Sequence, residues 1–107
     1  MDDDGVFKAL ADSGRRALLD ALFVRDGQSV QSLCAVLPSM TRFGVMKHIG
    51  VLEAANLVTA QRHGRTKLHF LNPIPIGRIA DRWISKYAQP YTRALLDLAD
   101  DLERPSA

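Results

Sequence analysis

Apolar residues recur at spacings of three and four along most of this chain, a pattern typical of helices that bury one face. The pattern predicts four short helices in the first half of the chain, the first over residues 6–12 and the fourth over residues 41–55. Their apolar positions are, helix by helix, Val6, Phe7 and Leu10; Ala17, Leu18, Ala21 and Leu22; Val30, Leu33 and Leu37; and Val45, Ile49 and Leu52.

Polar residues mark the ends of these helices. Asp12 or Ser13 can cap the second helix by accepting a hydrogen bond from a free backbone N–H group. Ser29 can cap the third helix and Thr41 the fourth in the same way. Asn56 follows the fourth helix and tolerates the left-handed backbone that ends many helices. Because Thr41 follows soon after Leu37, the last apolar position of the third helix, the connection between the third and fourth helices is very short.

After the fourth helix the helical pattern gives way to two β-favouring runs, LVTAQR and TKLHFL. Gly64 lies between them and supplies the positive φ that a tight hairpin turn needs. Side chains alternate along a strand, so Leu68 and Phe70 are expected on one face of the second strand. Lys67 and His69 are expected on the other face.

A long apolar stripe predicts a final helix over residues 76–102. Pro90 interrupts the stripe and should kink or restart the helix, because proline lacks the backbone N–H and clashes with the preceding turn. The stripe consists of Ile76, Ala80, Trp83, Tyr87, Tyr91, Leu95, Leu98 and Leu102.

The predicted order is three helices, a short turn, a fourth helix, a hairpin and a last helix. The fold class is therefore mainly α with a small β-hairpin, and the order is that of a winged helix-turn-helix. A chain of 107 residues suggests a single domain over 1–107, with a DNA-reading core over 29–71. In such folds the second helix of the pair lies in the major groove of DNA.

Charge along the chain supports this interpretation. The whole chain has a net charge of only +2, but the segment 42–67 holds five basic residues against the single acid Glu53. Such asymmetry suggests a polyanionic partner, although an ordinary solvated surface would also explain it. The candidate DNA-contacting residues are Thr41, Arg42, Phe43, Met46 and Lys47 on the fourth helix, and Arg62, His63, Arg65 and Lys67 on the wing over residues 62–67.

The candidate contacts have different chemistries. Arg42 can bind both acceptors of a guanine or hold a phosphate, and Lys47 can do either less selectively. Phe43 and Met46 can meet thymine methyl groups. Packing against the third helix is an equally good interpretation for Met46. The wing arginines are placed to bind phosphates or enter a narrow minor groove.

Other function classes lack support in the sequence. There is no Gly-rich phosphate loop and no motif for nucleophilic or metal-assisted catalysis, so an enzyme is not expected. No apolar run is long enough to span a membrane, and the start "MDDDG" does not resemble a signal peptide, so a cytoplasmic protein is expected. Cys34 is the single cysteine and cannot form an internal disulfide.

The segments "ALADSGRRALLDAL" and "SVQSLCAVLPSMTRFGVMKHIGVLEAANLVTAQRHGRTKLHFLNP" resemble the ArsR-type family of bacterial transcription regulators over roughly residues 6–87. The closer resemblance is to a subgroup often encoded beside small ligand-binding proteins of the SRPBCC type. The resemblance implies binding to promoter DNA, usually repression and often of the protein's own operon. It also implies a homodimer joined through helices 6–12 and 76–102, with interface candidates Val6, Phe7, Leu10, Ile79, Trp83, Tyr87, Tyr91, Leu95 and Leu98.

Metal-sensing members of that family carry a Cys-x-Cys pair in the third helix, or His and Asp ligands along the last helix. Here Cys34 matches one position, but Val36 occupies the other, and the last helix contains no histidine. Neither metal site can be assembled, so no metal and no cofactor are expected. The identity of any small-molecule effector is left open.

Two alternatives have distinct signatures. A winged helix can serve as a protein-interaction or dimerisation module without DNA binding, but such a module does not need a cationic helix and wing. A thiol- or metal-responsive repressor could work through Cys34, although buried free cysteines usually act as small hydrophobes.

Overall fold

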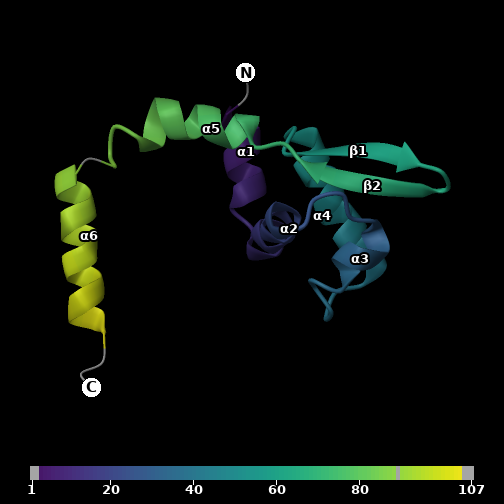
Figure 1. The fold of residues 1–107 in the computed structure, drawn as a ribbon, viewed down its shortest axis with the longest axis horizontal. Coiled ribbons are helices and arrows are strands. Elements are labelled where there is room, and N and C mark those ends of the chain that lie inside the picture. Colours follow the sequence, from purple (N-terminus) through teal and green to yellow (C-terminus); the bar gives the residue numbers. More distant parts are fainter. Residues whose placement is uncertain (1–2, 89, 105–107) are drawn as a thin grey trace. The chain divides into compact units, whose positions relative to one another are not determined.

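The computed structural model describes residues 3–88 and 90–104, with residues 90 and 91 described by their backbone only. The chain divides into two compact units, the first ending at Ile76 and the second beginning at Gly77 (Figure 1). The helices and strands of the first unit are α1 (Asp3–Leu10), α2 (Ser13–Val24), α3 (Val30–Cys34), α4 (Arg42–Ala54), β1 (Val58–His63) and β2 (Thr66–Leu71). Helix α5 (Ile74–Ile79) spans the boundary between the units.

The core of the first unit is made of the apolar stripes that the sequence pattern predicts. Each of helices α1 to α4 contributes buried side chains, as do Val58 at the start of β1 and Leu57 just before it. On α2 the buried set is shifted from the prediction, since Leu19 is buried whereas Ala17 and Ala21 are half-buried. The buried apolar residues are Val6, Ala9, Leu18, Leu19, Leu22, Leu33, Val45, Ile49, Leu52, Leu57 and Val58.

The predicted helix caps are confirmed. Asp12 accepts a hydrogen bond from the backbone N–H of Arg15 at 3.0 Å. Ser29 and Thr41 accept equivalent bonds at the starts of α3 and α4, each at 3.1 Å. Asn56, just after α4, has a φ of 62°.

Two helices differ in extent from the prediction. Helix α1 starts at Asp3 and ends at Leu10, rather than spanning 6–12, because Asp12 caps the next helix and acidic residues suit the first turn of α1. Helix α3 ends at Cys34 instead of reaching Leu37. From Ala35 onward the backbone bonds to the third preceding carbonyl, so the helix gives way to tight turns.

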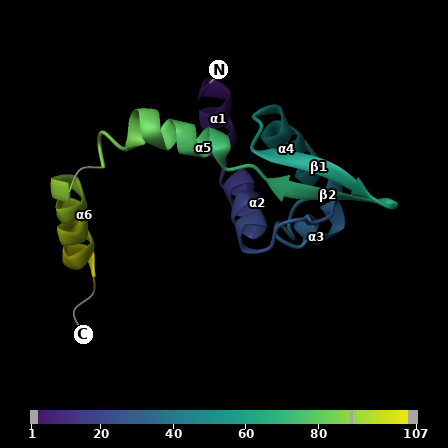
Figure 2. The ribbon, with the colours of Figure 1, turned by 45° about the horizontal axis from the view of Figure 1, so that its top comes forward.

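The two strands form an antiparallel hairpin that projects from the helices (Figures 1 and 2). His63 pairs with Thr66, which leaves a two-residue turn that begins with Gly64 at a φ of 63°, as predicted. His69 alternates with Leu68 and Phe70 as predicted, but it is 1% exposed whereas Lys67 on the same face is exposed. His69 forms hydrogen bonds with Gln28, in the loop before α3.

The predicted final helix over 76–102 is divided. Helix α5 passes into a π-helical turn over Ala80–Ile84, and α6 runs over Pro90–Glu103. Pro90 stands at the first position of α6, where the missing N–H is not needed for a helical bond. The proline therefore restarts the helix rather than kinking it. None of the helices described is long and apolar enough to cross a membrane.

Candidate nucleic-acid interface

Helix α4 exposes the face opposite its buried stripe. Val45 and Ile49 point into the core, while Phe43 on the outer face is 72% exposed and Lys47 beside it is also exposed. The Lys47 ammonium lies 5.8 Å from the centre of the Phe43 ring. Met46 is 50% exposed, and it also lines a small cavity together with Val30 of α3. The candidate reading face is thus available to a ligand.

The N-terminus of α4 is fixed by its cap. Thr41 is exposed, and its hydroxyl oxygen accepts the N–H bond from Gly44. A Cβ atom on Gly44 would lie 2.7 Å from Cγ of Met40, so the glycine allows the preceding turn to approach α4 closely. The space beside this glycine is therefore filled by the Met40 side chain of the same chain.

A groove of about 350 Å³ lies between the start of α3, the start of α4 and the hairpin. We call it the wing groove. Four basic side chains line it, and none of them has a hydrogen-bond or ion-pair partner within residues 3–88 and 90–104. No acidic residue is among the lining residues, which are Ser29, Val30, Gln31, Arg42, Arg62, Arg65, Thr66 and Lys67. A cluster of unpaired cations suits a polyanion such as a nucleic-acid backbone.

The remaining wing candidate, His63, is exposed at the end of β1, with its ring 6.3 Å from that of Phe70. The structure thus brings Arg42 of α4 together with Arg62, Arg65 and Lys67 of the wing. Phe43 and Lys47 lie on the outer face of α4 instead of in the wing groove.

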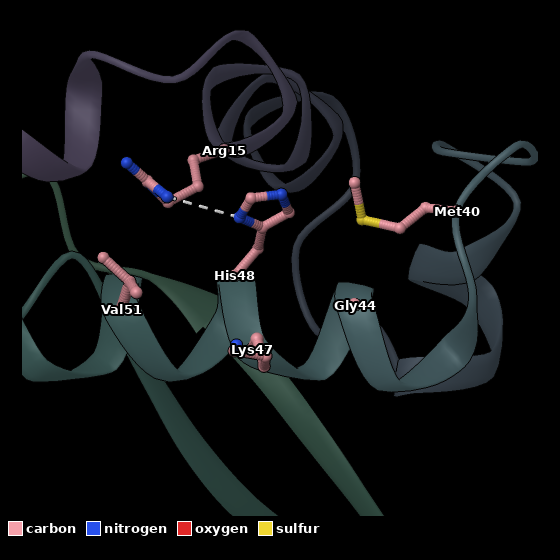
Figure 3. Close-up of a pocket in the computed structure, with 6 residues that line it drawn as sticks. All are labelled: Arg15, Met40, Gly44, Lys47, His48 and Val51. Carbon is pink, nitrogen blue, oxygen red and sulfur yellow. Dashed lines mark hydrogen bonds between the residues drawn. The ribbon is translucent and has the colours of Figure 1, made fainter.

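A second groove, of about 290 Å³, lies on the opposite flank of α4, toward α2 (Figure 3). We call it the α2-side groove. Arg15 and Met40 stand on either side of His48 in this view. The lining residues are Arg15, Met40, Gly44, Lys47, His48 and Val51.

A polar network at this groove joins three helices. The Nε and Nη2 groups of Arg15 donate to the carbonyl oxygens of Ala9 and Lys8 at 2.8 and 2.9 Å, at the end of α1. Its Nη1 lies 3.3 Å from Nδ1 of His48 on α4. Nε2 of His48 is 3.7 Å from Oδ2 of Asp12. His48 is thus a half-buried histidine that links α4 to Arg15 and Asp12.

Asp12 has a pKa below its ordinary value. The first cause is the hydrogen bond from the backbone N–H of Arg15, and the charges of His48 and Arg15 act in the same direction. The carboxylate that caps α2 is therefore ionised at neutral pH.

No local sequence pattern indicates the contact that holds the wing. His69 and Gln28 exchange backbone bonds of 2.8 and 3.1 Å, and Nδ1 of His69 lies 2.9 Å from the carbonyl oxygen of Gln28. A carbonyl can only accept, so Nδ1 carries the proton. The Gln28 side chain in turn donates to the carbonyls of Ala21 and Arg25. The wing is thereby tied to the loop before α3.

Comparison with known proteins gives the family. No protein-family model matches the chain. It is 38% identical over 86 residues to the uncharacterized HTH-type transcriptional regulator YuzN of Bacillus subtilis (strain 168), and the match covers 76% of this chain and 94% of YuzN. The crystal structure of an ArsR family transcriptional regulator is 31% identical, with a TM-score of 0.67 over 78% of this chain and 82% of that chain. The chain belongs to the ArsR family of transcriptional regulators.

Other structures agree with this assignment. An ArsR-like transcriptional regulator from Rhodococcus sp. RHA1 is 28% identical, with a TM-score of 0.71 over 96% of this chain and 92% of that chain. A homodimeric winged helix-turn-helix DNA-binding domain from Mycobacterium bovis shares the fold, at 20% identity and a TM-score of 0.60, over 80% of this chain and 84% of that chain. The predicted fold is confirmed: α3 and α4 form the helix-turn-helix, and β1 and β2 form the wing. The relatives are transcriptional regulators, a class of DNA-binding proteins and not of enzymes.

The dimer-interface candidates of this ArsR-family chain fall into two groups. Val6 and Ile79 are buried within the single chain, and Leu10 is half-buried, so they offer little surface to a partner. The exposed candidates are Phe7, Trp83, Tyr87, Leu95 and Leu98. The rings of Trp83 and Tyr87 stack, with centres 6.2 Å apart. The side chain of Tyr91 lies outside the described residues.

Metal-binding side chains do not cluster in the described part of this ArsR-family chain. No group of three or more His, Cys, Asp or Glu residues is close enough to hold an ion there. Cys34 is a half-buried free thiol at the end of α3.

Proposed function

We propose that this regulator is a homodimeric repressor that inserts α4 into the major groove of promoter DNA and places the wing groove on the phosphate backbone. Its own upstream region is the first DNA to test. Two α4 helices related by a two-fold axis would meet half-sites about 34–36 Å apart on one face of the duplex.

The observation that carries the proposal is the set of unpaired cations in the wing groove, adjacent to the exposed face of α4. Charged side chains that stabilise a fold are normally paired or hydrogen-bonded. No such partner is present in the described residues for the four basic side chains of the wing groove, Arg42, Arg62, Arg65 and Lys67. Phosphate groups would supply the missing partners, with release of counterions from the DNA.

The geometry divides the roles. Arg42 lines the wing groove with the wing cations, which favours a phosphate contact over base reading. Phe43 lies on the outer face of α4 and is proposed to meet a thymine methyl group. Lys47 is exposed beside it and is proposed to hold a phosphate or a base edge. Met46 extends that apolar contact on the wing side. Thr41 acts through its cap, which holds the start of α4 in place.

DNA binding can be measured by fluorescence anisotropy, with labelled DNA from the region upstream of the protein's own gene. Arg42→Ala combined with Lys47→Ala is expected to lose at least tenfold in affinity, on the order of two phosphate or base contacts. The control is Arg93→Ala on α6 combined with Arg104→Ala just after it, which removes the same charge at two exposed side chains. Equal binding by the two double variants would contradict the assigned face. A protein that binds no DNA at any salt concentration would instead fit a protein-interaction module.

The proposed dimer uses the exposed apolar residues of the last helices together with Phe7. Leu95 and Leu98 on α6 are 63% and 55% exposed in the single chain. These apolar side chains would become buried when two chains associate. Leu95→Asp combined with Leu98→Asp is expected to convert a dimer to a monomer in light scattering after gel filtration. Asp97→Asn combined with Asp101→Asn is the control. A dimer that survives the leucine changes would contradict this interface.

The expected subgroup is also part of the proposal. A gene for a small ligand-binding protein of the SRPBCC type beside this one, in an operon whose transcription rises when the regulator is deleted, would support both the subgroup and repression. Transcription that falls on deletion would contradict repression.

A further inference from the structure

We propose that the α2-side groove is a second phosphate-binding site, which takes a phosphodiester of the DNA strand that the wing groove does not contact. The inference rests on the proposed function, because it assumes that α4 lies in the major groove.

The two grooves lie on opposite flanks of α4. With about 3.6 residues per turn, Gly44, Lys47 and Val51 project to one side of a helix, and Arg42 projects to the other. The lining residues of the two grooves follow this division. Phe43 lies on the exposed face between them. The major groove is about 12 Å wide and admits a helix of about 10–12 Å diameter, so each flank of the helix meets one sugar–phosphate backbone.

The chemistry of the α2-side groove suits a phosphate. Arg15 and Lys47 line it, and no acid is among its lining residues. Lys47 has no hydrogen-bond or ion-pair partner among the residues described. A guanidinium carries five N–H donors, and Arg15 uses three of them toward Ala9, Lys8 and His48. Two donors remain for a ligand.

The Arg15 side chain is held in place before any ligand binds. Its bonds to the end of α1 fix the guanidinium, and the bond to His48 aligns it with α4 (Figure 3). A side chain that is already ordered loses less conformational entropy on binding. The ionised Asp12 lies beside His48 rather than among the lining residues, and it offsets part of the positive charge.

The rest of the groove is apolar. Met40, Gly44 and Val51 form its remaining surface, and Met40 is 36% exposed. A charged patch beside an apolar wall matches a sugar–phosphate unit, in which the deoxyribose presents C–H groups next to the phosphate. A free inorganic anion would not use that wall.

The test changes the charge of the groove at Met40, whose side chain lines the groove and can be replaced by a residue with a similar stem. Met40→Lys is expected to steepen the salt dependence of binding to the upstream DNA by about 0.9 in the slope of log K against log[salt], and Met40→Glu to weaken binding. A slope difference of about 0.9 means that the ratio of the affinity of Met40→Lys to that of the unmodified protein should fall about 3.5-fold when the salt concentration rises fourfold. The control positions are Thr59→Lys and Thr59→Glu, exposed at the end of β1 far from the hairpin turn.

A second arm identifies the ligand. Single phosphates of the DNA are replaced by neutral methylphosphonates, and binding is compared for the unmodified protein, Met40→Lys, and Arg62→Gln combined with Arg65→Gln. Some replacements should abolish the affinity gained by Met40→Lys, and these mark the phosphates beside the α2-side groove. Other replacements should weaken binding of the unmodified protein but not of the wing variant, and these mark the phosphates beside the wing. The two sets of phosphates should lie on opposite DNA strands. If they lie on the same strand, or if no replacement abolishes the gain, the inference is overturned.

The outcomes separate this inference from the proposed function. Salt-dependent binding that is lost in the wing variant, with Met40 and Thr59 variants behaving alike, would leave the proposed function standing and remove the second site. An unmodified protein that does not bind DNA would remove both.

Discussion

Thr41 offers a sharp test because two substitutions separate the stability of α4 from its affinity for DNA. Its hydroxyl accepts one hydrogen bond, 3.1 Å from the backbone nitrogen of Gly44, in an exposed position. Thr41→Ala removes the bond and leaves the N–H to water, so the expected loss is about 1 kcal/mol in the free energy of unfolding. For a domain of this size, that corresponds to a fall of about 4–8 °C in Tm.

Thr41→Asp should act in the opposite direction on stability. Aspartate is as good a cap as threonine or better, and its charge lies at the positive end of the helix dipole, worth about 0.3–1 kcal/mol. Its Tm should equal or exceed that of the unmodified protein. DNA affinity should fall, however, because the new carboxylate stands next to Arg42 at the mouth of the wing groove.

Thermal unfolding followed by circular dichroism at one fixed protein concentration measures the first quantity, and anisotropy measures the second. Ser13→Ala is the matched control, since Ser13 is an exposed hydroxyl at the start of α2 whose cap is Asp12. A Tm for Thr41→Ala equal to that of Ser13→Ala would refute the cap. Tight DNA binding by Thr41→Asp would place the start of α4 away from the phosphates.

Three further changes test other parts of the structure. Arg62→Gln combined with Arg65→Gln should reduce the slope of log K against log[salt] for DNA binding by about 1.8, because two phosphate contacts are lost. An unchanged slope would refute contact between the wing and the phosphates. Gly27 has a φ of 72°, so Gly27→Ala should be destabilised by about 1–2 kcal/mol in denaturant unfolding. Gly50 lies in α4, and a Cβ added there would have no atom within 4 Å, so Gly50→Ala should be stabilised by about 1 kcal/mol. Equal effects of the two substitutions would contradict this reasoning. Asp12→Asn keeps a capping oxygen but loses the charge. Because the pKa of Asp12 is lowered, its contribution is present above pH 3.8 and is lost as pH falls through the lower folded value, so the stability difference should narrow only in that acid range; a constant difference would refute it.

Local signals in the sequence were sufficient for most of the first unit. Thr41, Ser29 and Asp12 can be identified as caps because a cap depends on three or four consecutive residues. Gly64 and Asn56 are similar, since a positive φ is a property of one residue and its turn. The exposed face of α4 follows from helical periodicity alone.

Contacts between distant residues could not be read in the same way. His69 is buried, and its Nδ1 lies 2.9 Å from the carbonyl oxygen of Gln28, 41 residues earlier. Strand alternation indicates only that His69 shares a face with Lys67. Arg15 is the first residue of the basic pair Arg15–Arg16, and no local pattern indicates that its guanidinium bonds the carbonyl oxygens at the end of α1. Pro90 was recognised as an interruption, but the periodic apolar stripe on both sides of it could not distinguish a kink from a restart.

The bonds between Gln28 and His69 have a consequence for how this surface can change over evolutionary time. Two of them join backbone to backbone, and neither Gln28 nor His69 lines the wing groove, so the spacing between the loop before α3 and the wing does not depend on the side chains that line this groove. Substitutions at Arg62, Arg65 or Lys67 can therefore alter the charge of that groove while its width is preserved. Related regulators could acquire different DNA targets through such changes without refolding the surface that presents them.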